Sequence, residues 1–210
     1  MKKFIVIQIC LLILFTGALG GLLVNTDIYD EVESGITSVL CLSCIKLNPK
    51  TQLDFTYDTA TGDDHSDFVL DALYNGPIFI AYREDVCIAC DKMEPILQDI
   101  FSVHFEKEDT ITEEVSFDDA TVTFVHINID HANEQQIKSR FIYDKDDIGG
   151  VPMFTVVTLG YNSGFVEPYY ATVYGTLSLD TNEERKGFLT NMINDGIEFY
   201  NQNKEGYNRE

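Results

Sequence analysis

PIFIAYREDVCIACDKMEPIL, residues 77–97, is the stretch that decides the fold of this 210-residue chain. Residues 77–82 form a nearly continuous apolar run, which predicts a strand buried on both faces of a sheet. Cys87 and Cys90 follow, and apolar residues then recur at helical spacing, at Met93, Ile96, Leu97, Ile100 and Phe101. The order is therefore strand, Cys-x-x-Cys, helix. The amide groups and dipole at a helix N-terminus favour a thiolate at Cys87, so this order is typical of thiol–disulfide exchange sites.

A proline further along the chain gives the second signal. Gly149, Gly150, Val151 and Pro152 lead into the apolar run 153–159. Proline lacks the N–H group that a central strand must donate, so Pro152 is expected at the start of a strand. Its position after two glycines predicts a cis peptide bond between Val151 and Pro152.

Together these two signals resemble the thioredoxin family. In that family a strand leads into a redox-active Cys-x-x-Cys on a helix, and a cis-proline opens a later strand beside it. Pro95 stands five residues after Cys90, where the family also has a proline, and residues 173–178 with the following helix resemble its last strand and closing helix. The resemblance spans residues 68–200. It implies a three-layer α/β sandwich with a mixed central sheet, a class that the alternating strand and helix patterns also indicate.

The resemblance also implies a role for each motif residue. Cys87 is expected as the exposed nucleophile and Cys90, one turn into the helix, as the buried resolving thiol. Val151 and Pro152 are expected to bind extended substrate backbone beside the disulfide. The competing interpretations of Cys87 and Cys90 are a structural disulfide and one half of a metal site.

The sequence departs from the thioredoxin pattern at three places. Val86 replaces a tryptophan before the first cysteine, and Ile88-Ala89 replaces Gly-Pro between the cysteines. Ala81 occupies the strand position where thioredoxins carry a buried aspartate that helps to deprotonate the resolving cysteine. The first two departures argue against a standard cytosolic thioredoxin, and the third argues against fast reduction of substrates.

Acidic residues surround the cysteine pair. Glu84, Asp85 and Asp91 are all close to it in sequence. Negative charge disfavours a thiolate, so the pKa of Cys87 is expected to be less depressed than in a strong oxidant. The disulfide couple is therefore expected to be more reducing than the most oxidising members of the superfamily.

The remaining elements are predicted from the same periodicities. Strands are expected at 53–57, 122–130 and 169–174, and helices at 67–74, 90–105 and 131–141, with a last helix capped by Asp180 or Thr181. Residues 106–120 are acidic and weakly patterned, which indicates an insertion.

The four histidines are scattered, and His126 is expected to be partly buried with its hydrogen bonds satisfied rather than catalytic.

The overall charge excludes some classes of partner. The chain has 35 acidic and 14 basic residues, a formal net charge of −21. Nucleic-acid binding requires Lys and Arg to neutralise phosphate, so a nucleic-acid partner is not expected. Binding of the folded surface to anionic lipid is disfavoured for the same reason.

The N-terminus predicts export. Lys2 and Lys3 precede an apolar segment, Phe4 to Val24, which is long enough to span a bilayer. The charges on either side place the N-terminus in the cytosol and the rest of the chain outside the cytoplasm. We favour a signal-anchor, an N-terminal hydrophobic helix, over a signal peptide cleaved after Gly20 to give a secreted form, because the apolar stretch continues past the small residues. The expected divisions are the anchor or signal peptide 1–25, a juxtamembrane segment 26–50, a thioredoxin-like domain 51–203 and a polar tail 204–210.

A second Cys-x-x-Cys, formed by Cys41 and Cys44, lies in the juxtamembrane segment. It has three interpretations: a redox pair that exchanges with Cys87 and Cys90, a static local disulfide, or a four-cysteine zinc site made by both motifs. No histidine lies close to either motif in sequence, so zinc is disfavoured, and the position of Cys41 and Cys44 between anchor and domain favours the relay.

These inferences give one leading function. The sequence predicts a membrane-anchored, extracytoplasmic thiol–disulfide oxidoreductase that needs no cofactor beyond its own disulfide. Its partners would be protein thiols or disulfides and a membrane redox partner. The alternative is a non-catalytic binding or assembly module on the same scaffold, which the residues at 81 and 86 support.

Overall fold

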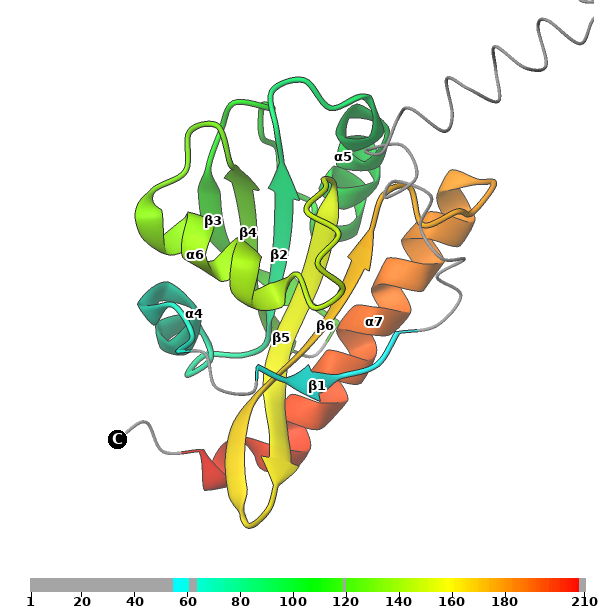
Figure 1. Ribbon diagram of the computed structural model, residues 1–210. Coiled ribbons are helices and arrows are strands. Elements are labelled where there is room, and N and C mark those ends of the chain that lie inside the picture. The colour runs from blue at the N-terminus through cyan, green and yellow to red at the C-terminus, as the bar shows by residue number, and fades with distance from the viewer. Residues whose placement is uncertain (1–54, 61–63, 119, 208–210) are drawn as a thin grey trace, which may run out of the picture. The chain divides into compact units, whose positions relative to one another are not determined.

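The computed structural model describes residues 55–60, 64–118 and 120–207, and these form an α/β fold with one mixed six-stranded sheet (Figure 1). The strand order is β1-β6-β5-β2-β4-β3. Only β2 and β4 pair in parallel among these neighbours. The strands are β1 (Asp58–Thr59), β2 (Ile78–Arg83), β3 (Ile111–Phe117), β4 (Ala120–Asn128), β5 (Met153–Asn162) and β6 (Phe165–Tyr174). The helices are α4 (Asp67–Ala72), α5 (Ile88–Phe101), α6 (Glu134–Tyr143), α7 (Asn182–Asn203) and the 3-10 turn η1 (Lys204–Gly206). The predicted class, α/β with a mixed sheet, is confirmed.

Helices cover both faces of the sheet, so the fold has three layers (Figure 1). Successive side chains of a strand point to opposite faces. Phe79 and Ala81 of β2 accordingly join a core with α5 and α7, whereas Ile80 and Tyr82 join a second core with α4 and α6. All six residues of β2 are buried, which explains why the sequence from 78 to 82 is apolar without alternation.

The position of β2 in the sheet brings three chain segments together. Ala81 pairs with His126 of the parallel strand β4 and with Phe154 of the antiparallel strand β5. The carboxyl ends of β2 and β4 therefore lie at the same end of the sheet as the beginning of β5. The cysteine motif follows β2 and Pro152 precedes β5, so the topology brings these two distant motifs to one end of the sheet.

Helix α5 begins at Ile88 and ends at Phe101, earlier than the predicted end at 105. Ser102 adopts a left-handed conformation with φ 54°, and this stops the helix. Val103 and Phe105 remain in the core beyond the helix end. Because these two residues are buried like those of the helix face, the apolar spacing in the sequence predicts a helix that continues to 105.

The insertion expected at 106–120 contains a strand, β3, and that prediction is corrected. Strand β3 pairs antiparallel with β4 from Ile111 opposite His126 to Phe117 opposite Ala120. Apolar residues alternate at Ile111, Val115 and Phe117, and all three contact the core or belong to it. Glu113 is exposed although it shares a face with Ile111 and Val115, and Glu114 lies on the opposite face, so the acidic residues of this edge strand interrupt the alternation in the sequence.

The strand predicted at 53–57 is also corrected within residues 55–60, because the strand pairing lies at Asp58–Thr59, opposite Tyr170 and Tyr169 of β6. Phe55 and Tyr57 do face the core, as their alternation suggested. The Tyr57 hydroxyl donates a hydrogen bond to the carbonyl oxygen of Met192 in α7, 2.5 Å away. These two side chains are therefore anchored by packing on a helix and not by a strand ladder.

The C-terminal elements are longer than expected. A two-residue turn at Ser163 and Gly164, both with positive φ, lets β5 and β6 extend to one long hairpin. Helix α7 is capped by Thr181, one of the two predicted residues, and runs to Asn203. Residues 201–203 complete α7, and residues 204–206 of the expected polar tail form η1.

No helix in the described part of the chain is long and apolar enough to cross a membrane. The predicted anchor, Phe4 to Val24, and the pair Cys41 and Cys44 lie outside the residues that the structure describes.

Candidate functional site

A disulfide joins Cys87 and Cys90 at the N-terminus of α5. Cys87 is the N-cap residue of the helix, and the Cys90 amide N–H donates a hydrogen bond of 3.1 Å to the Cys87 sulfur. An amide that points at this sulfur would also stabilise negative charge on it after reduction. Cys87 therefore lies at a helix N-terminus with an amide directed at its sulfur, as the sequence motif predicts.

The two cysteines differ less in exposure than predicted. Cys87 is 8% exposed and Cys90 is 2% exposed, so both are buried and the description of Cys87 as exposed is corrected. The order of exposure still favours Cys87 as the first sulfur that a reagent meets. The residues beside Cys87 are very exposed, Val86 at 92% and Ile88 at 76%, so two exposed apolar side chains flank Cys87.

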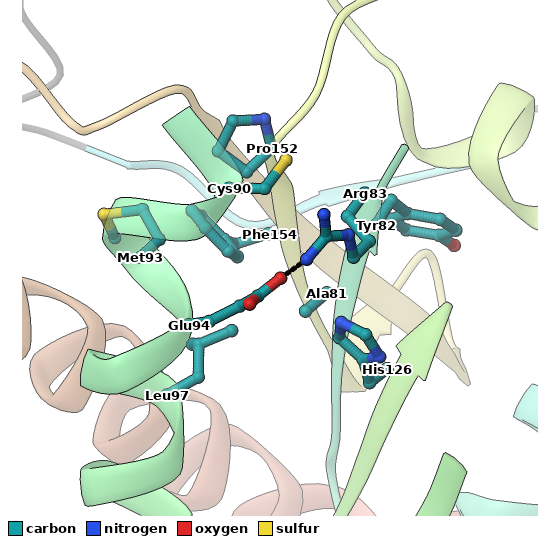
Figure 2. A pocket seen from close by; sticks show the side chains of 10 residues that line it. All are labelled: Ala81, Tyr82, Arg83, Cys90, Met93, Glu94, Leu97, His126, Pro152 and Phe154. Atoms are coloured by element: carbon teal, nitrogen blue, oxygen red, sulfur yellow. Dashed lines mark ion pairs between the residues drawn. The ribbon is translucent and has the colours of Figure 1, made fainter. Parts of the chain in front are cut away.

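A small cavity lies directly beneath Cys90 (Figure 2). Its volume is about 10 Å³, close to the roughly 10–15 Å³ that one enclosed water molecule needs. Pro152 lines the cavity together with Cys90, and the Val151–Pro152 peptide bond is cis, as predicted. Val151 instead packs, partly buried, against the second core. The cavity is lined by Ala81, Tyr82, Arg83, Cys90, Met93, Glu94, Leu97, His126, Pro152 and Phe154.

A buried arginine in this cavity was not predicted from the sequence. Arg83 is the last residue of β2, and its side chain is almost fully buried. Its guanidinium forms an ion pair with Glu94 of α5 and donates hydrogen bonds of 3.1 and 3.0 Å to the Glu84 carbonyl oxygen. A longer contact of 3.4 Å joins it to Asp91. Arg83 thus ties the end of β2 to the first two turns of the helix that carries the cysteines.

Glu94 reaches Arg83 because of its place on α5. Figure 2 shows its carboxylate extending from the helix toward the Arg83 guanidinium, in the region that Ala81 leaves open. Glu94 lies four residues after Cys90, on the same face of the helix. The Glu94 side chain is 17% exposed, so the ion pair is formed largely away from water.

His126 is buried beside the same cavity, and only one of its two ring nitrogens has a partner. Nδ1 lies 2.8 Å from the Asp109 carbonyl oxygen. A carbonyl oxygen can only accept, so Nδ1 carries the hydrogen and Nε2 carries a lone pair. Burial lowers the pKa of His126 to about 4. The expectation that this histidine is satisfied and partly buried is therefore corrected on both counts.

The acidic residues near the disulfide are not isolated negative charges. Asp85 accepts hydrogen bonds from Asn128, at 2.7 Å, and faces His131 at 3.2 Å, and the Asn128 contact is the main reason that the pKa of Asp85 lies below its usual value. Asp91 faces Arg83. The positive charge of Arg83 therefore offsets part of the charge of Asp91, whereas the hydrogen bond from Asn128 keeps Asp85 ionised.

The structure brings together three of the predicted site residues, Cys87, Cys90 and Pro152. It adds Arg83 and Glu94, for which two sequence signals existed. An arginine directly follows the buried run 77–82, and Glu94 interrupts the apolar helix face made by Cys90, Met93 and Leu97. A charge on a stripe that is otherwise apolar is expected to find a partner when it is buried.

Comparison of the sequence with models of known protein families and with curated proteins finds no match. Within residues 55–60, 64–118 and 120–207, no three His, Cys, Asp or Glu side chains are grouped so that they could hold a metal ion. The function is therefore inferred from the site itself.

Proposed function

We propose that the chain is a thioredoxin-like thiol–disulfide oxidoreductase that acts on protein disulfides through Cys87 and Cys90. The observation that carries the proposal is the disulfide at the N-terminus of α5, beside Pro152 at the start of β5. The strand β2, the cysteine motif and α5 follow one another in the order that the resemblance implies, and β5, β6 and α7 close the domain in the same order.

The proposed reaction has two exchange steps. The Cys87 thiolate attacks one sulfur of a substrate disulfide, a Cys87–substrate disulfide forms, and the other substrate sulfur leaves with the bonding electrons and takes up a proton. Cys90 then loses its proton, attacks Cys87 and releases the second substrate thiol. The substrate disulfide is reduced and the Cys87–Cys90 dithiol is oxidised. Oxidation of a substrate dithiol runs the same steps in reverse.

The surface around the disulfide suits an unfolded or extended substrate segment. Val86 and Ile88 present apolar side chains on either side of Cys87. Apolar surface of this kind contributes to binding when it is removed from water. Pro152 lies beside Cys90, where an extended chain crossing the disulfide would meet it.

A reductase assay on a protein disulfide tests the proposal. The full-length chain should reduce the disulfide when it is supplied with a dithiol, and Cys87→Ser should abolish this activity. Cys90→Ser should instead accumulate a mixed disulfide between Cys87 and the substrate, because the resolving thiol is missing. Cys41→Ser combined with Cys44→Ser is the matched control for loss of a Cys-x-x-Cys pair. A wild-type chain that never exchanges with protein disulfides would support the alternative, a binding or assembly module.

We also propose that the domain is held at a membrane, outside the cytoplasm, by residues Phe4 to Val24. Support comes from the length of this apolar segment and from the charges that flank it. The protein should stay in the membrane pellet after carbonate extraction. Release from the pellet, or a mature N-terminus at Gly21, would replace the anchor by a cleaved signal peptide.

For Cys41 and Cys44 we propose a relay that exchanges with the main pair. The support is the presence of two Cys-x-x-Cys motifs in one chain with an export signal. A chain with Cys44→Ser and Cys90→Ser retains one cysteine of each motif, and mild oxidation should yield an internal Cys41–Cys87 disulfide. Crosslinks between chains only, or none, would assign Cys41 and Cys44 to a local disulfide.

A further inference from the structure

The cavity beneath Cys90, the proposed resolving thiol, is also lined by the two members of an ion pair. Cys90 is nearly inaccessible to solvent, and Arg83 and Glu94 line the same cavity (Figure 2). Unit charges interact far more strongly in such a setting than in water. The thiolate of Cys90 would therefore respond to any imbalance between these two side chains.

The two charges currently oppose each other. The Arg83 guanidinium would favour a thiolate at Cys90, and the Glu94 carboxylate would disfavour it. Besides Arg83 and Glu94, the titratable residues that line the cavity are Cys90, Tyr82 and His126. The low pKa of His126 keeps its side chain neutral near pH 7. The field at Cys90 thus depends chiefly on how fully Glu94 cancels Arg83.

Asp91 is the weaker partner of the same arginine. Its side chain is 57% exposed and lies 3.4 Å from the guanidinium, whereas Glu94 is mostly buried and in direct contact. Solvent screens an exposed charge much more than a buried one. Glu94 is therefore the residue that neutralises Arg83 on the side of the cavity.

We propose that Glu94, by neutralising Arg83, controls how readily the Cys90 thiol becomes a thiolate and so sets the rate of the resolving step. The inference rests on the proposed function and deepens it. In that step the Cys90 thiol gives its proton to solvent, its sulfur bonds to Cys87, and the substrate sulfur leaves with the electrons of the broken bond and is protonated. Glu94 and Arg83 touch none of the reacting atoms in this account, so they are positioning residues that act through charge.

Two substitutions that each remove one charge of the ion pair test the proposal because they should act in opposite directions. Glu94→Gln leaves the arginine uncompensated, which should increase the thiolate fraction of Cys90 at a given pH at least tenfold. Arg83→Gln leaves the carboxylate uncompensated and should decrease it. The double variant, Arg83→Gln with Glu94→Gln, should return to within about threefold of wild type. A structural role would instead give effects of one sign.

The measurement is pulse alkylation of the reduced full-length chain over a range of pH. Mass mapping follows Cys90 separately from the other cysteines. The pH at the midpoint of the alkylation rate reports the ionisation of the Cys90 thiol, whereas restricted access of the reagent lowers the absolute rate without moving this midpoint. A tenfold change in thiolate fraction moves this midpoint by one pH unit. Asp91→Asn is the matched control: it removes an exposed partner of the same arginine, so its shift should be less than half that of Glu94→Gln.

The outcomes are distinct. Shifts of the same sign for Glu94→Gln and Arg83→Gln, no shift in either, or a larger shift for Asp91→Asn would overturn the proposal. If Glu94→Gln does not fold, the difference between Arg83→Gln and the double variant still isolates the charge of Glu94. The titration needs no substrate, so an inactive wild type would refute the proposed function without deciding this inference.

Discussion

His126 should make the protein lose stability as the pH falls, by an amount that follows from its burial. The imidazole is enclosed beside the cavity, and its ring lies 4.2 Å from that of Phe105. Burial is the main reason that its pKa falls from 6.5 to about 4, and the nearby Arg83 charge lowers it further, while the contact with Asp109 opposes the shift. The folded state therefore disfavours the proton that the unfolded state accepts.

Proton linkage gives the sign and the size of the change in the free energy of unfolding that His126 causes. Between pH 6.5 and pH 4 the unfolded chain binds this proton and the folded chain does not, so the free energy of unfolding falls as the pH falls through this window. The contribution is complete above pH 6.5, about 2 kcal/mol of it is lost by pH 5, and about 3 kcal/mol is lost below pH 4. This is a large share of the roughly 5–15 kcal/mol that stabilises a typical domain.

Denaturant unfolding with the disulfide intact measures the effect. The full-length chain would be compared with His126→Asn at pH 8, 6 and 5, in one mild detergent because of the apolar N-terminus. Asparagine can still donate to the Asp109 carbonyl but does not titrate. Wild type should lose about 2 kcal/mol more than His126→Asn between pH 8 and pH 5. His104→Asn, at an exposed histidine, controls for the loss of an imidazole. Parallel pH profiles for wild type and His126→Asn would refute the reasoning.

Three further predictions concern the disulfide, a helix cap and the apolar surface. Under mild reduction Cys87 should be alkylated before Cys90, since it is the more accessible sulfur, and mass mapping that finds Cys90 labelled first would reverse the assigned roles. Thr181→Ala removes the cap of α7 and should lower the free energy of unfolding by about 1 kcal/mol in denaturant titrations; an unchanged value would mean that the cap contributes nothing. Ile88→Asn, which removes apolar surface without adding charge beside Cys87, should slow exchange with protein disulfides but not with a small disulfide, whereas Phe165→Asn at the distant hairpin turn should slow neither, and an equal loss in both assays would contradict a docking role for Ile88.

The parts of the fold that the sequence predicts well are those with local causes. The strand before the cysteines and the helix after them depend on apolar runs and helical spacing within a few residues. Pro152 was recognised because it lacks an N–H, a property of the residue itself. The class of the fold then follows from the alternation of strands and helices.

The parts that were missed depend on contacts between distant residues. Phe55 and Tyr57 do face the core, as their alternation with polar residues predicts. Their side chains are held by packing on α7, which lies far along the chain, so the local sequence alone does not distinguish this packing from a strand. Arg83 after a buried run and Glu94 on an apolar helix face each indicate a buried charge, but neither position names its partner. Their pairing becomes visible only when β2 and α5 are packed and Ala81 leaves space between them.

The two open edges of the sheet have a consequence for self-association. Unpaired strand edges expose N–H and C=O groups that other chains can extend into aggregates, and charged or very short edge strands prevent this. Here β1 has two residues, and β3 has exposed glutamates at Glu113 and Glu114. At the β3 edge these glutamates therefore discourage copies of this acidic protein from adding a further strand to the sheet.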